Sequence, residues 1–392
     1  MKNIVIIGTL DTKGTEIAFL KKQIEKRGFT TTLIDCGILG EPNFKSDITK
    51  EIVAKTGGRS IEELQKAAED GKDRSLTLNV MIKGAEKLVQ DLFEKQQIDG
   101  MISFGGAQGT AIGITIMKKL PIGIPKLMVT SIMGQSVGMK DISVIQTPDG
   151  MIKLNSTMEK ALSQAAGAIC GMADVEIQKP TTPLPLIGIT ALGVTTPAVR
   201  RIVRLLNEKK YDPIVFHGRT EILNELIEEG RIQGLIDLTP FEIYLLWERR
   251  LQSVYKKKIP QIISAGGLDM LIFPGTKEIL PKKYKNRPVH AHTSNIVLVR
   301  TNKEEISRAA KIIAENANKV YDKTIIAIPL LGFSEIDKKE QQFYDPDTDK
   351  TFIETLKFNL KKEIKVIEYN SHINDEEFSM AVVELFIGLF HS

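Results

Sequence analysis

IDGMISFGGAQGT, residues Ile98–Thr110, is the stretch that decides the fold. An apolar run, Met101–Phe104, leads directly into the glycine-rich GGAQGT (Gly105–Thr110), and a helical pattern follows. A buried strand that turns through glycines into a helix presents backbone N–H groups and the positive end of the helix dipole. Glycine permits the close approach and the positive φ angles that such a turn needs. The pattern predicts an anion site, most often used for phosphate, although a turn without a ligand has the same glycines.

Length and composition narrow the class of protein. At 392 residues the chain exceeds one ordinary core, so two domains are expected. Apolar residues make up 42% and charged residues 26%, as in soluble globular proteins. The net charge of +4 gives no reason to expect a nucleic-acid partner, and no segment has the pattern of a membrane span. Two cysteines, Cys36 and Cys170, lie in no metal or redox spacing and suit a cytoplasmic location.

Strand and helix patterns alternate along the chain, which favours parallel sheets covered by helices. The linker QKPTTPLP (Gln178–Pro185) interrupts the alternation, and the pattern starts again after it. We therefore expect an α/β protein with two Rossmann-like doubly wound subdomains, residues 1–180 and 181–392, and a ligand cleft between them. The expected strands are Asn3–Ile7, Thr30–Asp35, Lys126–Thr130, Leu186–Thr190, Pro213–His217, Ile259–Ser264, Ile296–Arg300 and Ile325–Pro329. The expected helices include Glu16–Arg27, Ile61–Ala68, Leu78–Gln96, Lys153–Gly167, Glu221–Glu229, Glu304–Val320 and Met380–Phe390, together with one that has Pro197 in its first turn and Thr195 or Thr196 as N-cap.

Standard nucleotide motifs fit only in part. The segment from Gly8 to Thr15 resembles a P-loop, but its lysine and glycine are exchanged and its spacing is longer. Lys13 can still meet a phosphate as a point charge, and Arg74 can clamp one with two parallel hydrogen bonds. Gly105–Gly109 is not G-x-G-x-x-G, so a nicotinamide or flavin cofactor has no support. The candidate nucleotide-binding residues are Gly8, Thr9, Lys13, Arg74, Gly105, Gly106, Gln108, Gly109 and Thr110.

Candidates for catalysis or metal binding are fewer. Four residues near predicted strand ends are available as acid or base, and their roles stay open: Asp11, His217, Asp269 and His292. Asp345, Asp347 and Asp349 alternate as in a calcium loop, but the glycine and the final glutamate of that loop are missing. A polar loop is the simpler interpretation, with Thr351 and Glu354 as a capping box for the next helix. No metal ligand is assigned.

Several of these segments together resemble one family, the uncharacterised family built like the N-terminal ATP-binding domain of the tomato mosaic virus resistance protein, a viral replication inhibitor. The similarity runs over nearly the whole chain. The matching segments include GTLDTKGTE (Gly8–Glu16), IDCGILG (Ile34–Gly40), DRS (Asp73–Ser75), GGAQGT (Gly105–Thr110), GVTTPAV (Gly193–Val199), VFHG (Val215–Gly218), GLDM (Gly267–Met270), HTSNIVLVRT (His292–Thr301) and HIND (His372–Asp375). The family's glycine loop usually reads GGSGGT, and Ala107 and Gln108 depart from it here.

The resemblance implies two Rossmann-like subdomains, ATP bound with Mg²⁺ in the cleft between them, and a homodimer. The glycine loop would then be the phosphate site. Three functions remain open: a nucleotide-binding module without turnover, an enzyme acting on a phosphorylated or nucleotide-linked small substrate, and a protein-interaction module tuned by ATP.

Overall fold

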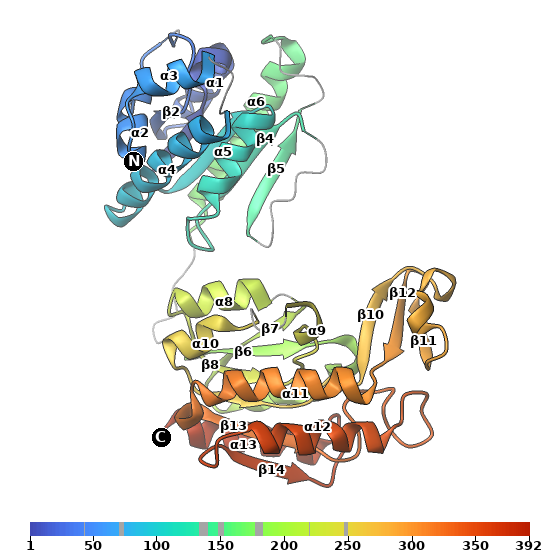
Figure 1. Cartoon of the computed structure of the whole chain (residues 1–392). Coiled ribbons are helices and arrows are strands. Elements are labelled where there is room, and N and C mark those ends of the chain that lie inside the picture. Colours follow the sequence, from blue (N-terminus) through green and yellow to red (C-terminus); the bar gives the residue numbers. More distant parts are fainter. Residues whose placement is uncertain are drawn as a thin grey trace. The chain divides into compact units, whose positions relative to one another are not determined.

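Two parallel sheets, one in each half of the chain, organise the structure (Figure 1). The computed structural model describes residues 1–42, 44–69, 74–132, 140–147, 153–176, 183–218, 220–246 and 250–392, without the side chains of Arg74 and Leu246. The chain divides into two units, Met1–Lys179 and Pro180–Ser392. Each unit has its own sheet and its own buried apolar clusters. This confirms the α/β class with two doubly wound subdomains.

The N-terminal unit contains one five-stranded sheet with the order β2-β1-β3-β4-β5, and its strands pair in parallel. Its elements are β1 (Asn3–Gly8), α1 (Leu10–Glu25), β2 (Thr30–Asp35), α2 (Lys50–Gly57), α3 (Ile61–Glu69), α4 (Arg74–Glu94), β3 (Gly100–Gly105), α5 (Ala107–Met117), β4 (Lys126–Thr130), β5 (Ile142–Gln146) and α6 (Ser156–Asp174).

Helices cover both faces of this sheet. Ile4 and Ile6 of β1 pack with α1 and α6, whereas Val5 and Ile7 pack on the other face with α2, α3, α4 and α5. Every residue of β3 and β4 is buried. Strands that are covered on both faces are continuously apolar, which explains why these two segments are recognisable in the sequence.

The C-terminal unit repeats this winding in a six-stranded sheet with the order β14-β13-β9-β8-β6-β7, again with parallel pairing. Its elements are β6 (Leu186–Ala191), α7 (Thr196–Glu208), β7 (Asp212–His217), α8 (Thr220–Glu228), β8 (Ile232–Asp237), α9 (Ile243–Leu246), α10 (Gln252–Lys257), β9 (Gln261–Ile263), α11 (Lys303–Asn318), β13 (Thr324–Pro329), α12 (Pro346–Asn359), β14 (Lys365–Tyr369) and α13 (Glu376–Phe390). Helices α7 and α13 pack on one face, and α9, α11 and α12 on the other.

A small antiparallel sheet is inserted between β9 and α11. It consists of β10 (Met270–Pro274), β11 (Val289–Thr293) and β12 (Ile296–Arg300), in the order β10-β12-β11. Figure 1 shows it at the end of the unit toward which the β6 arrow points. The expected strand Ile296–Arg300 is therefore present with its predicted bounds, but it belongs to this insertion rather than to the parallel sheet. None of the described helices is long and apolar enough to cross a membrane.

One local prediction is wrong in both its parts. Asp347 and Asp349 do not lie in a polar loop, and Thr351 and Glu354 do not form a capping box, because α12 already begins at Pro346. Asp345 caps this helix: its side chain accepts a hydrogen bond from the Thr348 backbone N–H at 3.1 Å. An aspartate followed by proline at the first helical position is a sufficient start signal, and Asp345 lies six residues before the predicted cap Thr351.

Glycines set the distance between α2 and α4. A Cβ on Gly84 of α4 would lie 2.0 Å from the carbonyl oxygen of Val53, and a Cβ on Gly57 of α2 would lie 2.1 Å from that of Val80. These are backbone atoms, so a side chain at either position forces the two helices apart.

We expect Gly84→Ala to lower the free energy of unfolding by about 1–3 kcal/mol, as overpacked cores do. The matched control is Gly171→Ala in α6, where an added Cβ meets no atom of the described chain within 4 Å. That variant should gain up to about 1 kcal/mol from the better helix propensity of alanine. Urea unfolding followed by circular dichroism measures both values. Equal stabilisation by the two substitutions would contradict the close packing of α2 and α4.

Candidate functional site

The strand order of the N-terminal unit creates a crevice beside β1. The chain winds from β1 to β2 on one side and continues to β3 on the other, so the loops after β1 and β3 diverge. A cavity of about 470 Å³ lies between the segments that follow β1, β2 and β3. Its described lining residues are Thr9, Asp11, Thr12, Cys36, Gly37, Ile38, Leu39, Gly40, Ala68, Thr77, Leu78, Met81, Gln108 and Ile112. The volume falls within the range of small-molecule sites.

Two aspartates hold the loop after β2 against the start of α1. Asp35 Oδ1 accepts hydrogen bonds from the backbone N–H groups of Leu10 at 3.0 Å and Gly37 at 2.8 Å. Asp11 Oδ2 accepts from Ile38 at 2.9 Å and Leu39 at 3.1 Å. The second oxygen of Asp11, Oδ1, is buried without a hydrogen-bond partner in the described chain. Asp11 thus anchors the cavity wall through one carboxylate oxygen, and its other oxygen has no hydrogen-bond partner among the described residues.

The glycine loop forms the predicted strand-to-helix turn. Gly105 ends β3, Gly106 occupies the N-cap position, and α5 follows. A Cβ on Gly105 would lie 2.7 Å from Gly109 Cα, whereas one on Gly106 would meet no described atom within 4 Å. Gly105 is therefore required by packing, and Gly106 faces open space. The first N–H groups of a helix have no acceptor inside it, so this turn directs N–H groups outward.

Thr110 stabilises the turn through hydrogen bonds on its buried side. Its hydroxyl donates to the Gly105 carbonyl oxygen at 3.1 Å and lies 2.7 Å from the Thr130 hydroxyl. Its backbone N–H donates to the carbonyl oxygen of Gly106 at 2.8 Å, and the residue is fully buried. The structure therefore gives Thr110 an internal role, while Gln108 is exposed at the cavity wall.

The remaining predicted nucleotide-binding residues have different surroundings. A Cβ on Gly8 would lie 2.2 Å from Ile17 Cδ1, so this glycine allows α1 to pack on β1. Thr9 precedes α1 and lines the cavity, with its hydroxyl 2.9 Å from that of Thr12. Lys13 interrupts the helical backbone of α1 with φ −128° and ψ 17°, and it is not among the described lining residues. The side chain of Arg74 lies outside the described residues.

The structure places the three candidate catalytic residues of the C-terminal unit in different environments. His217 is exposed at the end of β7, and His292 is exposed on β11. Asp269 is fully buried. Within the described residues, no hydrogen bond joins any two of the three. The geometry inside this unit therefore does not assemble them as an acid–base pair.

Asp269 belongs instead to a buried charge cluster with Asp337, Asp349 and Arg300. All five N–H donors of Arg300 find acceptors: the carbonyl oxygens of Phe343, Asp269 and Asp345, the Thr301 hydroxyl, and Asp349 Oδ1 at 2.6 Å. Asp337 Oδ1 lies 3.8 Å from the same guanidinium. Arg300 therefore ties the inserted sheet to the start of α12.

Three carboxylates around one guanidinium do not all ionise readily. Burial raises the pKa of Asp269 to about 7, and the nearby Asp337 carboxylate adds to the shift. Burial also raises the pKa of Asp337 and of Asp349. Asp269 Oδ2 accepts from the Ser334 hydroxyl at 2.6 Å. No group of three or more histidine, cysteine or carboxylate side chains in the described ranges is placed to hold a metal ion.

In the C-terminal unit, the loop after β14 is hydrogen-bonded to the start of α7, which follows β6. Asn374 Oδ1 accepts from the Ala198 backbone N–H at 3.3 Å, in the first turn of α7. Asn374 Nδ2 donates to the Val194 carbonyl oxygen at 2.9 Å, and Arg201 Nη1 donates to the carbonyl oxygen of Asn374 at 2.5 Å. Two distant motifs, GVTTPAV and HIND, therefore meet here. Local sequence patterns cannot predict this contact, because its partners are 176 residues apart.

Fold and cavity together define a protein of two doubly wound α/β units, with a ligand-sized cavity at the switch point of the first. The chain belongs to the Uncharacterised protein family (UPF0261): the N-terminal domain of that family matches residues 2–178 and its C-terminal domain matches residues 184–390. This confirms the resemblance seen in the sequence.

Relatives from bacteria and plants match over nearly the whole chain. A UPF0261 protein of Clostridium tetani is 37% identical, with 99% of each chain covered. The ToMV resistance protein Tm-1(GCR237) of Solanum lycopersicum is 30% identical over 98% of this chain, which spans 55% of that protein. Among solved structures, the co-structure of S. aureus MnaA with UDP is 9% identical over 67% of this chain and 79% of that one. Its TM-score of 0.22 is too low to bear on fold or ligand.

We expect Asp269→Asn to remove part of the pH dependence of stability. The pKa of Asp269 is higher in the folded protein, about 7, than its ordinary value of 3.8. Its contribution to stability is therefore complete below the ordinary value and is lost as the pH rises to about 7. The free energy of unfolding of the wild type, minus that of the variant, should fall across this window.

Urea unfolding at a series of pH values measures this difference. Asp322→Asn, which changes an exposed aspartate of the same unit, is the control and should follow the wild type. A wild-type-minus-variant difference that stays constant with pH would show that Asp269 does not hold its proton in the folded protein.

Proposed function

We propose that the N-terminal unit binds a phosphate-bearing nucleotide, with ATP as the expected ligand, in the cavity beside β1. The observation that carries the proposal is that Gln108 and Ile112 of α5 line this cavity, while Gly106 at the N-cap of the same helix has open space beside it. Ligands of doubly wound sheets bind outside the carboxyl ends of the strands at such a switch point. The identity of the nucleotide follows from the family resemblance.

The cavity offers suitable surroundings for the two ends of a nucleotide. Apolar side chains of Ile38, Leu78 and Met81 line it on one side and can cover a base. The first turn of α5 also lines the cavity, through Gln108. The backbone N–H groups and the helix dipole at this helix N-terminus favour phosphate. Thus the glycine turn would hold phosphate, and α4 with the loop after β2 would hold the base.

Among the described lining residues, Asp11 is the one carboxylate that could hold a magnesium ion accompanying the nucleotide. Asp11 Oδ1 is buried and without a described partner, and carboxylate oxygen is what Mg²⁺ prefers. Magnesium usually keeps several waters and takes only one or two carboxylates, with the rest from substrate phosphates. Asp11 is thus proposed to hold the ion rather than to act as a general base. Lys13 and Arg74 remain proposed sources of positive charge.

We propose that the protein binds the nucleotide, and we propose no reaction of it. The acid–base candidates of the C-terminal unit are either exposed and separate or, for Asp269, fully buried in the Arg300 cluster. In the C-terminal unit the start of α7 is hydrogen-bonded to Asn374, and we propose no second nucleotide site there. The family resemblance adds a homodimer in the cytoplasm as part of this proposal.

Isothermal titration calorimetry with ATP, ADP and pyrophosphate tests the proposal, in the presence and absence of magnesium. We expect saturable 1:1 binding of ATP, with magnesium increasing its affinity because it screens phosphate charge beside Asp11. Absence of heat and of any thermal shift with all three compounds would refute the nucleotide site.

Gly106→Val should weaken ATP binding about tenfold to a hundredfold, as loss of one charge-assisted hydrogen bond does. Gly106 has φ −74° and ψ −152°, which any residue adopts, and its Cβ enters open space, so the fold should persist. Gly171→Val on α6, where an added Cβ also meets no described atom, is the matched control. Unchanged ATP affinity in a natively folded Gly106→Val protein would mean that the loop is only a turn.

A further inference from the structure

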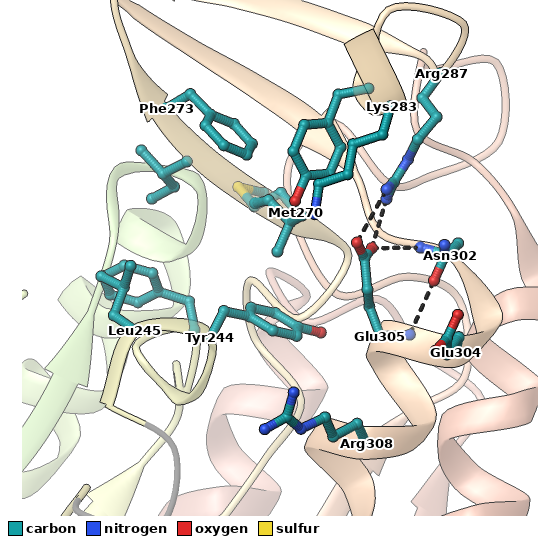
Figure 2. A pocket seen from close by; sticks show the side chains of 14 residues that line it. Tyr244, Leu245, Met270, Phe273, Lys283, Arg287, Asn302, Glu304, Glu305 and Arg308 are labelled. Carbon is teal, nitrogen blue, oxygen red and sulfur yellow. Dashed lines mark hydrogen bonds and ion pairs between the residues drawn. The ribbon is translucent and has the colours of Figure 1, made fainter. Parts of the chain in front are cut away.

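A second cavity, of about 540 Å³, lies entirely within the C-terminal unit (Figure 2). The inserted sheet forms one wall through β10 and the segment before β11, and α9 and the first turns of α11 form the other. Its described lining residues are Phe241, Tyr244, Leu245, Met270, Leu271, Ile272, Phe273, Lys283, Tyr284, Arg287, Asn302, Glu304, Glu305 and Arg308. None of them belongs to the proposed nucleotide site.

Aromatic and aliphatic side chains make up most of the interior surface. The rings of Phe273 and Tyr284 lie 4.7 Å apart, centroid to centroid, at an interplanar angle of 51°. Phe241 and Met270 are buried at the base, and Tyr244 is fixed there because its hydroxyl donates to the Leu268 carbonyl oxygen at 2.8 Å. Figure 2 shows the Phe273 and Tyr244 rings on either side of the Met270 side chain. Such a surface suits a flat apolar body.

One part of the rim is already neutralised. Arg287 donates from Nη1 and Nη2 to the two oxygens of Glu305, at 3.0 and 2.6 Å. Glu305 Oε2 also accepts from the Asn302 backbone N–H at 3.1 Å, and Asn302 Oδ1 accepts from that of Glu305 at 2.8 Å. This capping box uses an N–H of the first turn of α11, so the helix start is less suited to a phosphate than the glycine loop is.

The remaining charges favour one negative group on the ligand. Three cations and two carboxylates occur among the described lining residues, which leaves one net positive charge. Beside the pair of Arg287 and Glu305, the lining holds the two cations Lys283 and Arg308 and the carboxylate of Glu304, and all three side chains are exposed. Figure 2 shows Lys283 extending from the inserted sheet and Arg308 extending from α11 beneath the Tyr244 ring.

We infer that this cavity binds a small organic monoanion with an aromatic body, such as an aromatic carboxylate, independently of the nucleotide. The rings take the body, and Lys283 with Arg308 attract the carboxylate. A polyanion such as a nucleoside triphosphate needs more cationic donors than one net charge supplies. A bare inorganic anion leaves the apolar wall exposed to water.

Calorimetry with 2-naphthoate as the probe tests the inference on the full chain. We expect saturable 1:1 binding that is about tenfold or more weaker for the neutral isostere 2-naphthamide. Inorganic phosphate should not compete. Failure of 2-naphthoate to bind, or equal binding of the amide, would overturn the inference.

Substitutions in the lining test whether 2-naphthoate binds in this cavity. Arg308→Glu and Lys283→Glu, both at exposed positions, should each weaken 2-naphthoate binding about tenfold, and Phe273→Ala should do so through the ring. Lys311→Glu, an exposed cation of α11 that does not line the cavity, is the control and should bind normally. Gly106→Val should also bind 2-naphthoate normally, which separates this site from the nucleotide site. Undiminished binding in both charge variants would place the probe elsewhere.

Discussion

The winding of the two parallel sheets is the constraint on which the rest of this structure depends. A parallel pair requires a crossover through a covering helix, and such crossovers are right-handed. In each unit the chain places its second strand on one side of the first strand and its third strand on the other side. This happens beside β1 and again beside β6. The loops that leave these strands must therefore separate at the carboxyl edge of the sheet. Each unit therefore has a crevice at a position determined by topology, before any side chain is chosen.

The two units use this common crevice differently. In the N-terminal unit, Asp11 and Asp35 hold the neighbouring loop aside and the cavity stays open. In the C-terminal unit, the carboxamide of Asn374 accepts a hydrogen bond from the first turn of α7. The cavity in that unit lies instead under the inserted sheet, and Arg300 joins this sheet to the first turn of α12. One winding pattern has thus produced two unlike surfaces.

The elements that could be predicted from the sequence are those whose burial imposes a clear pattern of apolar residues. Thr30–Asp35 and Lys126–Thr130 were predicted with their observed bounds, and GGAQGT was recognised as a strand-to-helix turn. The central strand β8 was missed because Gly234 interrupts its apolar run, and that glycine is required by contact with Phe386. The edge strand β5 was missed because it is largely exposed. Long-range partners, such as Asn374 for α7, and the second cavity had no local signal at all.

The complete hydrogen bonding of Arg300 has a consequence for the inserted sheet. A strand of this sheet cannot move away from α12 without leaving a buried guanidinium or its carboxylate partners unpaired, which is strongly unfavourable. The sheet is therefore held in one position before any molecule arrives. A compound entering beneath it meets a preorganised wall, so little of its binding free energy is spent on ordering the protein, and selectivity for shape follows from rigidity rather than from induced closure.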